Sequence, residues 1–373
     1  MLNIPFDPSL SHLSKDDVRS VELAEYLLAA AERVGDRQFD HAAALLNLCE
    51  SLASKTDLGD VLRVPSPSIL LSAHERFPSY QMQQLASVQA MTESVASARR
   101  IHVIDLKIKS GLHWIGLMQA LESRPAGPQV EILKVTALCT GPVEPVRSTG
   151  GRLADFARSK GLNFSFAIVH VDDVTDLKEE MFAVDRGKEA VLVYSEHAFV
   201  TEIGRPDRME ALMRVMRGLN PQLMVVTETE ANNNSPHFSA RFVDALFHVD
   251  ACMGKDDEEG RAFMEGVMMG RMISNVVARE GEERVVRGVK LDVWRAFFRR
   301  FEMVERRLSS VAWQQVRLVR ETAPNGEFCT VERDGKAMVI GWKGTPLVSI
   351  STWKFFRSAR LVSGTKHLRI EFE

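Results

Sequence analysis

The chain has 373 residues, of which 45% are hydrophobic, and a formal net charge of -3 at pH 7. Such a composition is typical of a globular protein with enough apolar material for one large core or two modest cores, and the small net charge gives no indication of nucleic-acid binding. Four cysteines stand singly along the chain, so we expect neither a zinc site nor a disulfide framework, and a reducing compartment is favoured. Residues 1–10 lack the pattern of a signal peptide, and no apolar stretch approaches the roughly 18 residues of a membrane span, so we expect neither secretion nor membrane insertion.

A polar, proline-marked lead segment, residues 1–18, precedes two leucine-rich amphipathic helices predicted over residues 21–34 and 40–53. Leu45, Leu48 and Leu52 lie on one stripe of the second helix. Packing against the rest of the protein is the favoured interpretation of this stripe, and binding of a partner protein is the alternative, because spacing alone does not separate the two. Further helix is expected between residues 68 and 97.

Short apolar strands then alternate with helices. The strands are expected at residues 101–104, 130–138, 164–171, 190–194 and 222–227, and the helices at 112–121, 143–160, 177–182 and 206–219. This alternation implies right-handed crossovers and a mostly parallel sheet with helices on both faces.

The rhythm changes after the fifth strand. We expect a helical insertion at about residues 235–281, whose first helix carries Phe238, Phe242 and Leu246 and whose second, over residues 258–279, is rich in methionine. Another helix is expected at 294–301, followed by strands at 328–332, 337–342 and 347–353 that form an antiparallel hairpin, and a basic tail at 355–373. A parallel sheet that finishes with antiparallel strands is the layout of the class I methyltransferases. The predicted fold class is therefore α/β, with a methyltransferase-like, Rossmann-type sheet.

The loop after the first strand carries the most informative local signal. In enzymes that bind a dinucleotide or S-adenosylmethionine, glycines at alternate positions after the strand-ending acid let the backbone approach the ligand. Here Asp105 ends the strand, and the alternate positions hold Lys107, Lys109 and Gly111. The second strand also ends without a carboxylate for ribose hydroxyls, in the residues 137–140. The sequence thus predicts the architecture of a cofactor fold without a cofactor.

Two other segments place chemically active residue types at strand ends. Tyr194-Ser195-Glu196-His197 combines nucleophile, acid and base types, but adjacent residues point in different directions and form no triad alone. Glu228 and Glu230, in the segment 227–234, could bind a metal, although a capped loop leading to the helix at Ser235-Pro236 is the simpler interpretation. We therefore predict no catalytic residues and no metal site.

Basic residues are dense between residues 284 and 307 but are interleaved with acids. A solvated face of mixed charge is the favoured interpretation, with phosphate contact through residues such as Arg295 and Arg299 as the alternative.

Several segments resemble the motifs of the plant GRAS family, the group of the DELLA, SCARECROW and SHORT-ROOT regulators. The strand and loop after residue 100 are similar to the VHIID motif, and residues 19–98 and 148–181 are similar to the two leucine repeats. Residues 190–288 resemble the PFYRE region, and residues 341–353 resemble the SAW motif. The residues that carry these resemblances are Ile101, His102, Val103, Ile104, Asp105, Gly111, Trp114, Arg241, Phe242, Arg279, Gly281, Trp342, Gly344 and Trp353.

The resemblance implies a non-enzymatic transcriptional regulator in the nucleus, with residues 19–98 as a helical cap and residues 99–354 as an α/β core. It also implies dimerisation with other GRAS proteins, binding to zinc-finger transcription factors, and direct DNA contact in some members. The leucine stripe at Leu45 and the helix from Phe238 are the expected partner surface. An S-adenosylmethionine-dependent methyltransferase is the alternative function.

Overall fold

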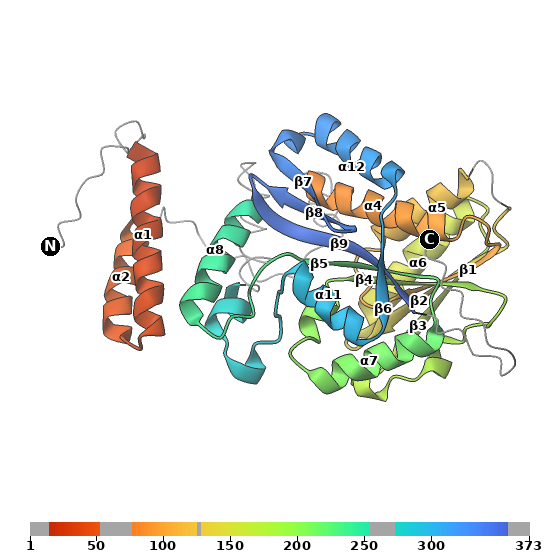
Figure 1. Cartoon of the computed structure of the whole chain (residues 1–373), viewed down its shortest axis with the longest axis horizontal. Helices are drawn as coiled ribbons and strands as arrows, with labels where there is room; N and C mark the ends of the chain where they lie inside the picture. The colour runs from red at the N-terminus through yellow and green to blue at the C-terminus, as the bar shows by residue number, and fades with distance from the viewer. Residues whose placement is uncertain (1–14, 53–76, 125–127, 254–272, 357–373) are drawn as a thin grey trace, which may run out of the picture.

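A single sheet of nine strands organises the described residues of the computed structural model, which are 15–52, 77–124, 128–253 and 273–356 (Figure 1). The strand order is β3-β2-β1-β4-β5-β9-β8-β7, and β6 pairs with β9. The strands are β1 (Arg100–Asp105), β2 (Ile132–Cys139), β3 (Phe164–His170), β4 (Ala190–Glu196), β5 (Leu223–Thr229), β6 (Met303–Arg306), β7 (Cys329–Asp334), β8 (Ala337–Trp342) and β9 (Thr345–Phe355). The first five strands are parallel, and β9 runs antiparallel to β5. The predicted fold class is confirmed: the sheet is mostly parallel and finishes with antiparallel strands.

Helices cover both faces of the sheet (Figure 1). On one face lie α4 (Pro78–Ser94), α5 (Leu112–Glu122), α6 (Val143–Ser159) and α12 (Ser310–Thr322), and on the other lie α7 (Pro206–Leu219) and α11 (Leu291–Arg300). Successive residues of β1 show why the strand is apolar throughout: Val103 packs into the core of the first face and Ile104 into the core of the second. Both side chains are fully buried.

The N-terminal helices form a pair beside the sheet domain. In Figure 1, α1 (Lys15–Gly35) and α2 (Phe39–Leu52) lie side by side and approach α8 (Phe238–Met253), which contacts α1. Ala30 and Ala31 of α1 and Ala42 of α2 are buried. The two helices predicted at the N-terminus are therefore confirmed, while residues 53–76 lie outside the described part of the chain.

Local signals explain where the helices start and stop. Pro206 opens α7, where a missing N–H costs nothing, and Asn220 ends it in the left-handed conformation. Ser309 caps α12, because its Oγ accepts a hydrogen bond from the Ala312 N–H.

Two predicted details were wrong or incomplete, and a third is mostly untested. The segment expected as a helix at 177–182 instead forms two short 3-10 turns, Val174–Asp176 and Glu179–Phe182, separated by extended backbone at Leu177 and Lys178. Strand β6 and helix α12 were not expected at all. The methionine-rich helix predicted at 258–279 falls mostly outside the described residues, and its described end is a π-helical turn, Ser274–Ala278.

Candidate functional site at the carboxyl ends of the parallel strands

Charged residues gather where β1, β4 and β5 end. Strand pairing aligns Asp105 of β1 with Tyr194 of β4, and Glu196 of β4 with Thr227 of β5, so the ends of the three strands lie at one edge. This is the edge at which open α/β sheets bind ligands. The polar cluster here, which we call the strand-end cluster, consists of Asp105, Lys107, Lys109, His113, Glu196, His197 and Glu228.

Asp105 is turned inward and holds the loop and helix that follow it. Its Oδ1 accepts a hydrogen bond from the Lys107 N–H at 3.0 Å, and its Oδ2 accepts one from Trp114 Nε1 at 2.8 Å. The Asp105 side chain is fully buried. It is therefore an anchor for the start of α5.

Gly111 lies at the start of α5 with φ of +79°, in the left-handed region. A Cβ at this position would lie 2.9 Å from Thr149 Cγ2, and the Thr149 Oγ1 donates a hydrogen bond to the Lys109 carbonyl. The absence of a Cβ at Gly111 therefore lets α6 pack closely against the loop. This packing explains the glycine without a bound ligand.

The two lysines reach across to the end of β4. Lys109 Nζ donates to Glu196 Oε1 at 3.0 Å, and Lys107 Nζ donates to the His197 carbonyl at 3.0 Å. Burial is the largest cause that lowers the pKa of Lys107, and the neighbouring Lys109 lowers it further. A cofactor-binding enzyme has glycines at these loop positions, which leave room for the ligand. In this chain, the side chains of Lys107 and Lys109 occupy the same positions and bind the end of β4.

The pKa values of the two buried glutamates of the cluster are shifted in opposite directions. Burial tends to raise the pKa of Glu196, but the neighbouring Lys109, together with His113 and His197, outweighs burial and lowers this pKa to about 2. For Glu228, burial dominates and raises the pKa to about 8. Its Oε1 accepts a hydrogen bond from the Phe199 N–H at 2.9 Å, whereas its Oε2 is buried without a hydrogen-bond partner. Glu228 therefore holds its proton at neutral pH.

The cluster does not assemble a nucleophile with a base. Ser195 is fully buried, and its Oγ has no hydrogen-bond partner. The His197 Nδ1 lies 3.3 Å from Thr229 Oγ1, and burial lowers the pKa of His197 to about 3. Ser195 and His197 are therefore not hydrogen-bonded to each other.

The two glutamates considered as metal ligands support different elements. Glu228 accepts a hydrogen bond at the turn Phe199–Thr201, while both oxygens of Glu230 accept the Leu291 N–H at the start of α11. Within residues 15–52, 77–124, 128–253 and 273–356, no group of three or more His, Cys, Asp or Glu is arranged to hold a metal ion.

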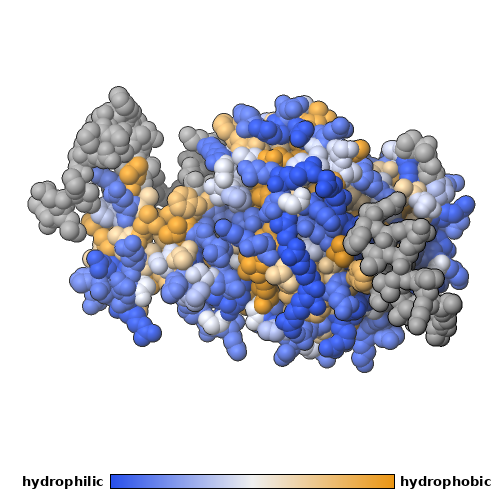
Figure 2. Space-filling model, in the orientation of Figure 1, coloured by the Kyte–Doolittle hydropathy of each residue, from blue (hydrophilic) through white to orange (hydrophobic). Residues whose placement is uncertain are grey.

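The expected partner surface is partly exposed. On α2, Leu48 is 46% exposed and Leu45 is half-buried, and Leu52 is the last residue of the helix. On α8, the side chains at Phe238, Phe242 and Leu246 are half-buried, and Phe247 is 58% exposed. Figure 2 shows hydrophobic residues gathered over the α1–α2 pair and the neighbouring α8.

Arg241 and Trp353 make structural contacts inside the protein. Arg241 is fully buried and donates to the carbonyls of Ser235 and Val276 and to Glu280. Trp353 of β9 packs its ring against Phe298 of α11. Arg279 and Gly281, by contrast, are exposed.

The two arginines considered for DNA contact differ. Arg295 donates to Glu305 and Asp334 and is 14% exposed, so its charge is already compensated. Arg299 is exposed on α11.

None of the helices in the described ranges is long and apolar enough to cross a membrane.

Sequence reasoning missed two polar features. One is a buried network in which His102 contacts Glu189 and Thr136, and Lys134 also pairs with Glu189. The other is an arginine-lined pocket beside α7. Both combine residues that are distant in sequence, and the only advance signal was the density of arginines after residue 283.

The sheet and the strand-end cluster define the class: a Rossmann-type α/β protein in which its own charged side chains occupy the ligand-binding edge. A search of family models identifies the GRAS domain family over residues 65–354. The chain therefore belongs to the GRAS domain family, as the motif resemblance indicated.

Individual relatives agree with this assignment. The chain is 29% identical over 366 residues to DELLA protein RGL1 of Arabidopsis thaliana, covering 90% of this chain and 70% of the relative. It is 28% identical over 382 residues to DELLA protein 1 of Medicago truncatula, covering 90% of this chain but only 63% of the relative. The crystal structure of SCL7 in Oryza sativa shares the fold, with a TM-score of 0.75 at 24% identity, covering 89% of this chain and 99% of that one.

Proposed function

We propose that this chain is a transcriptional regulator that works in the nucleus through protein contacts and without catalysis. The observation that carries the proposal is the strand-end cluster, in which Lys109 is paired with Glu196 and Lys107 with the His197 carbonyl at the edge where a Rossmann-type enzyme binds its cofactor. A ligand entering here would have to break these interactions between buried or partly buried groups.

The second support is the apolar surface of the helical pair. Phe39, Leu46 and Leu48 of α2 and Phe247 of α8 are each between 46% and 63% exposed. Exposed apolar side chains that gather on neighbouring helices are typical of protein-binding surfaces. We propose that this surface, which we call the helical-pair surface, binds a second GRAS domain or a zinc-finger transcription factor.

Sedimentation velocity tests the surface directly. The double variant Leu48→Asp/Phe247→Asp is expected to shift self-association toward the monomer, because a charge in an apolar contact is costly to bury. Leu318→Asp is the matched control, since Leu318 is 59% exposed on α12, on a different part of the molecule. Equal sedimentation of the natural chain and the double variant at all concentrations would count against self-association through this surface.

The regulatory role is tested in plant cells. A fluorescent fusion of the full chain is expected to accumulate in the nucleus. A transcriptional reporter driven by the co-expressed partner is expected to respond to the natural chain and to Leu318→Asp, but not to Leu48→Asp/Phe247→Asp. Direct DNA contact predicts a binding constant that falls steeply with added salt and on replacement of Arg299. Exclusion of the fusion from the nucleus would contradict the proposed role.

A further inference from the structure

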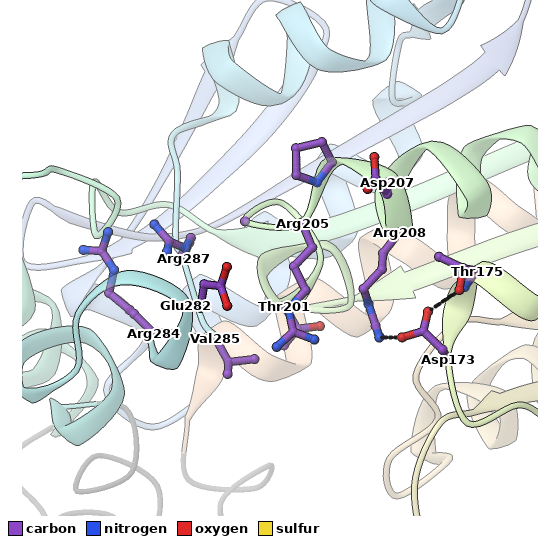
Figure 3. A pocket seen from close by; sticks show the side chains of 12 residues that line it. Asp173, Thr175, Thr201, Arg205, Asp207, Arg208, Glu282, Arg284, Val285 and Arg287 are labelled. Atoms are coloured by element: carbon purple, nitrogen blue, oxygen red, sulfur yellow. Dashed lines mark hydrogen bonds and ion pairs between the residues drawn. The ribbon is translucent and has the colours of Figure 1, made fainter.

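A pocket of about 490 Å³ lies between the start of α7 and the segment that follows Gly281. Figure 3 shows Arg205 and Arg208 on the α7 side of the pocket and the Glu282 carboxylate facing them from the opposite side, while the guanidinium of Arg284 is turned away from Arg205. The volume falls within the range of small-molecule sites, which is roughly 300 to 1,000 Å³. None of the residues that line it belongs to the strand-end cluster.

One of the four arginines in this pocket is fully compensated. Arg208 donates to Asp173 and, through Nε, to Glu202 Oε2 at 2.7 Å, and these acids raise its pKa. Asp173 in turn accepts from the Thr175 N–H and hydroxyl. These contacts fix one wall of the pocket, as the dashed lines in Figure 3 show.

The other three arginines have no ion pair with an acid in the described part of the chain. Arg287 donates to Asn234 Oδ1 at 3.1 Å and to the Gly281 carbonyl at 2.6 Å, which are neutral acceptors. Arg284 is only 5% exposed, donates to the Ser235 carbonyl at 3.3 Å, and has an Nε without a hydrogen-bond partner. Burial and the nearby Arg241 and Arg287 lower the pKa of Arg284, and they outweigh the nearby Glu280, which raises it. A buried cation beside like charges is costly, and an anion in the pocket would offset that cost through charge attraction.

The first turn of α7 adds further donors. Pro206 is the first helical residue, and the residue before it, Arg205, provides no side-chain cap. The N–H groups of the first turn have no acceptor within the helix, and the helix dipole favours an anion beside them.

Two carboxylates on the pocket wall favour a hydrogen-bond donor, rather than an anion, on the part of the ligand that lies beside them. Asp207 and Glu282 are exposed and have no ion pair with another described residue. Carboxylates accept hydrogen bonds from hydroxyl groups, so a ligand with both an anionic group and several hydroxyls fits this lining better than a bare anion.

We propose that this pocket binds a small polyhydroxylated phosphate monoester, such as a sugar phosphate. The phosphate is directed to the arginines, and the hydroxyls are directed to Asp207 and Glu282. The site gives the protein a small-molecule ligand that is independent of the strand-end cluster and of the helical-pair surface.

Isothermal titration calorimetry at low ionic strength tests this site with glucose 6-phosphate, glucose and inorganic phosphate. Saturable binding of glucose 6-phosphate is expected, with weaker binding of phosphate and no binding of glucose. Binding is expected to weaken from pH 7.5 to pH 5.5, because the second pKa of a phosphate monoester is about 6. Absence of binding up to about 1 mM glucose 6-phosphate, or equal affinity for inorganic phosphate, would overturn the proposal.

Variants separate the site from a general charge effect. Arg205→Ala is expected to weaken binding at least about tenfold, since hydrogen bonds to charged groups contribute roughly 1.5 to 3 kcal/mol. Arg214→Ala removes the same charge from an exposed position of α7 outside the pocket and is expected to bind normally. Glu282→Gln is expected to weaken glucose 6-phosphate but not inorganic phosphate. Equal losses in Arg205→Ala and Arg214→Ala would refute the assigned pocket, and thermal unfolding of each variant verifies that it folds.

Discussion

Replacement of Glu228 by glutamine is expected to raise the free energy of unfolding, and the gain is expected to grow as the pH rises from 6.5 to 8. Burial holds the pKa of Glu228 at about 8 in the folded protein, against an ordinary value of 4.5. Between these two values the unfolded chain has released a proton that the folded chain still holds. Stability attributable to this group therefore falls as the pH rises.

The size of the effect follows from the shift. Full linkage amounts to about 1.4 kcal/mol per pH unit, so the natural chain is expected to lose roughly 1.5 to 2 kcal/mol between pH 6.5 and pH 8 through this carboxyl group. His102, His197 and His248, whose pKa values burial lowers, act in the opposite direction, and their effect fades as the unfolded chain loses its histidine protons up to about pH 7.5. These histidines are common to the natural chain and Glu228→Gln, so the difference between the two pH dependences isolates Glu228.

Urea denaturation followed by tryptophan fluorescence measures this slope, because Trp114, Trp294 and Trp353 are all buried. Glu228→Gln is expected to flatten the dependence on pH, and the exposed Glu180→Gln is expected to keep it. Parallel curves for the natural chain and Glu228→Gln would refute the reasoning that Glu228 is protonated in the folded protein.

Two further predictions concern the strand-end cluster. Lys109→Met is expected to destabilise the protein by about 1.5 to 3 kcal/mol in urea denaturation at pH 7, because Glu196 loses the donor that keeps its buried charge paired. Lys160→Met breaks a surface pair with Glu122 and is expected to cost less than about 1 kcal/mol, and equal losses would argue against the pairing. Gly111→Ala is expected to cost more in thermal unfolding than Gly187→Ala: both have positive φ, but only at Gly111 would a Cβ meet another residue. If the two alanine variants lose the same amount of thermal stability, close packing of α6 does not explain the glycine at position 111.

The sheet was predictable because its strands are buried on both faces. The short run Ile101–Ile104, bounded by charged residues, favours a strand buried on both faces, and the structure places its apolar side chains in two cores. Helix α12 was missed although Ala312, Val316 and Val319 have helical spacing and are buried.

The site was predictable only in part. The two lysines at alternate positions after Asp105 indicated a closed ligand edge, but their partners lie on β4 and the turn that follows it. Lys109 and Glu196 are 87 residues apart, and only the pairing of β1 with β4 brings them together. The arginine-lined pocket likewise combines residues near 173, 205 and 284, whose proximity depends on how α7 and the later loop pack. Periodicity contains no information about such contacts between distant elements.

The most direct measurement for the central claim is a calorimetric titration of the full chain with S-adenosylmethionine. Because Lys107, Lys109 and Glu196 interact across the strand ends, no saturable heat is expected up to about 1 mM ligand. Saturable binding with a dissociation constant near 1 μM would contradict the account and favour a methyltransferase.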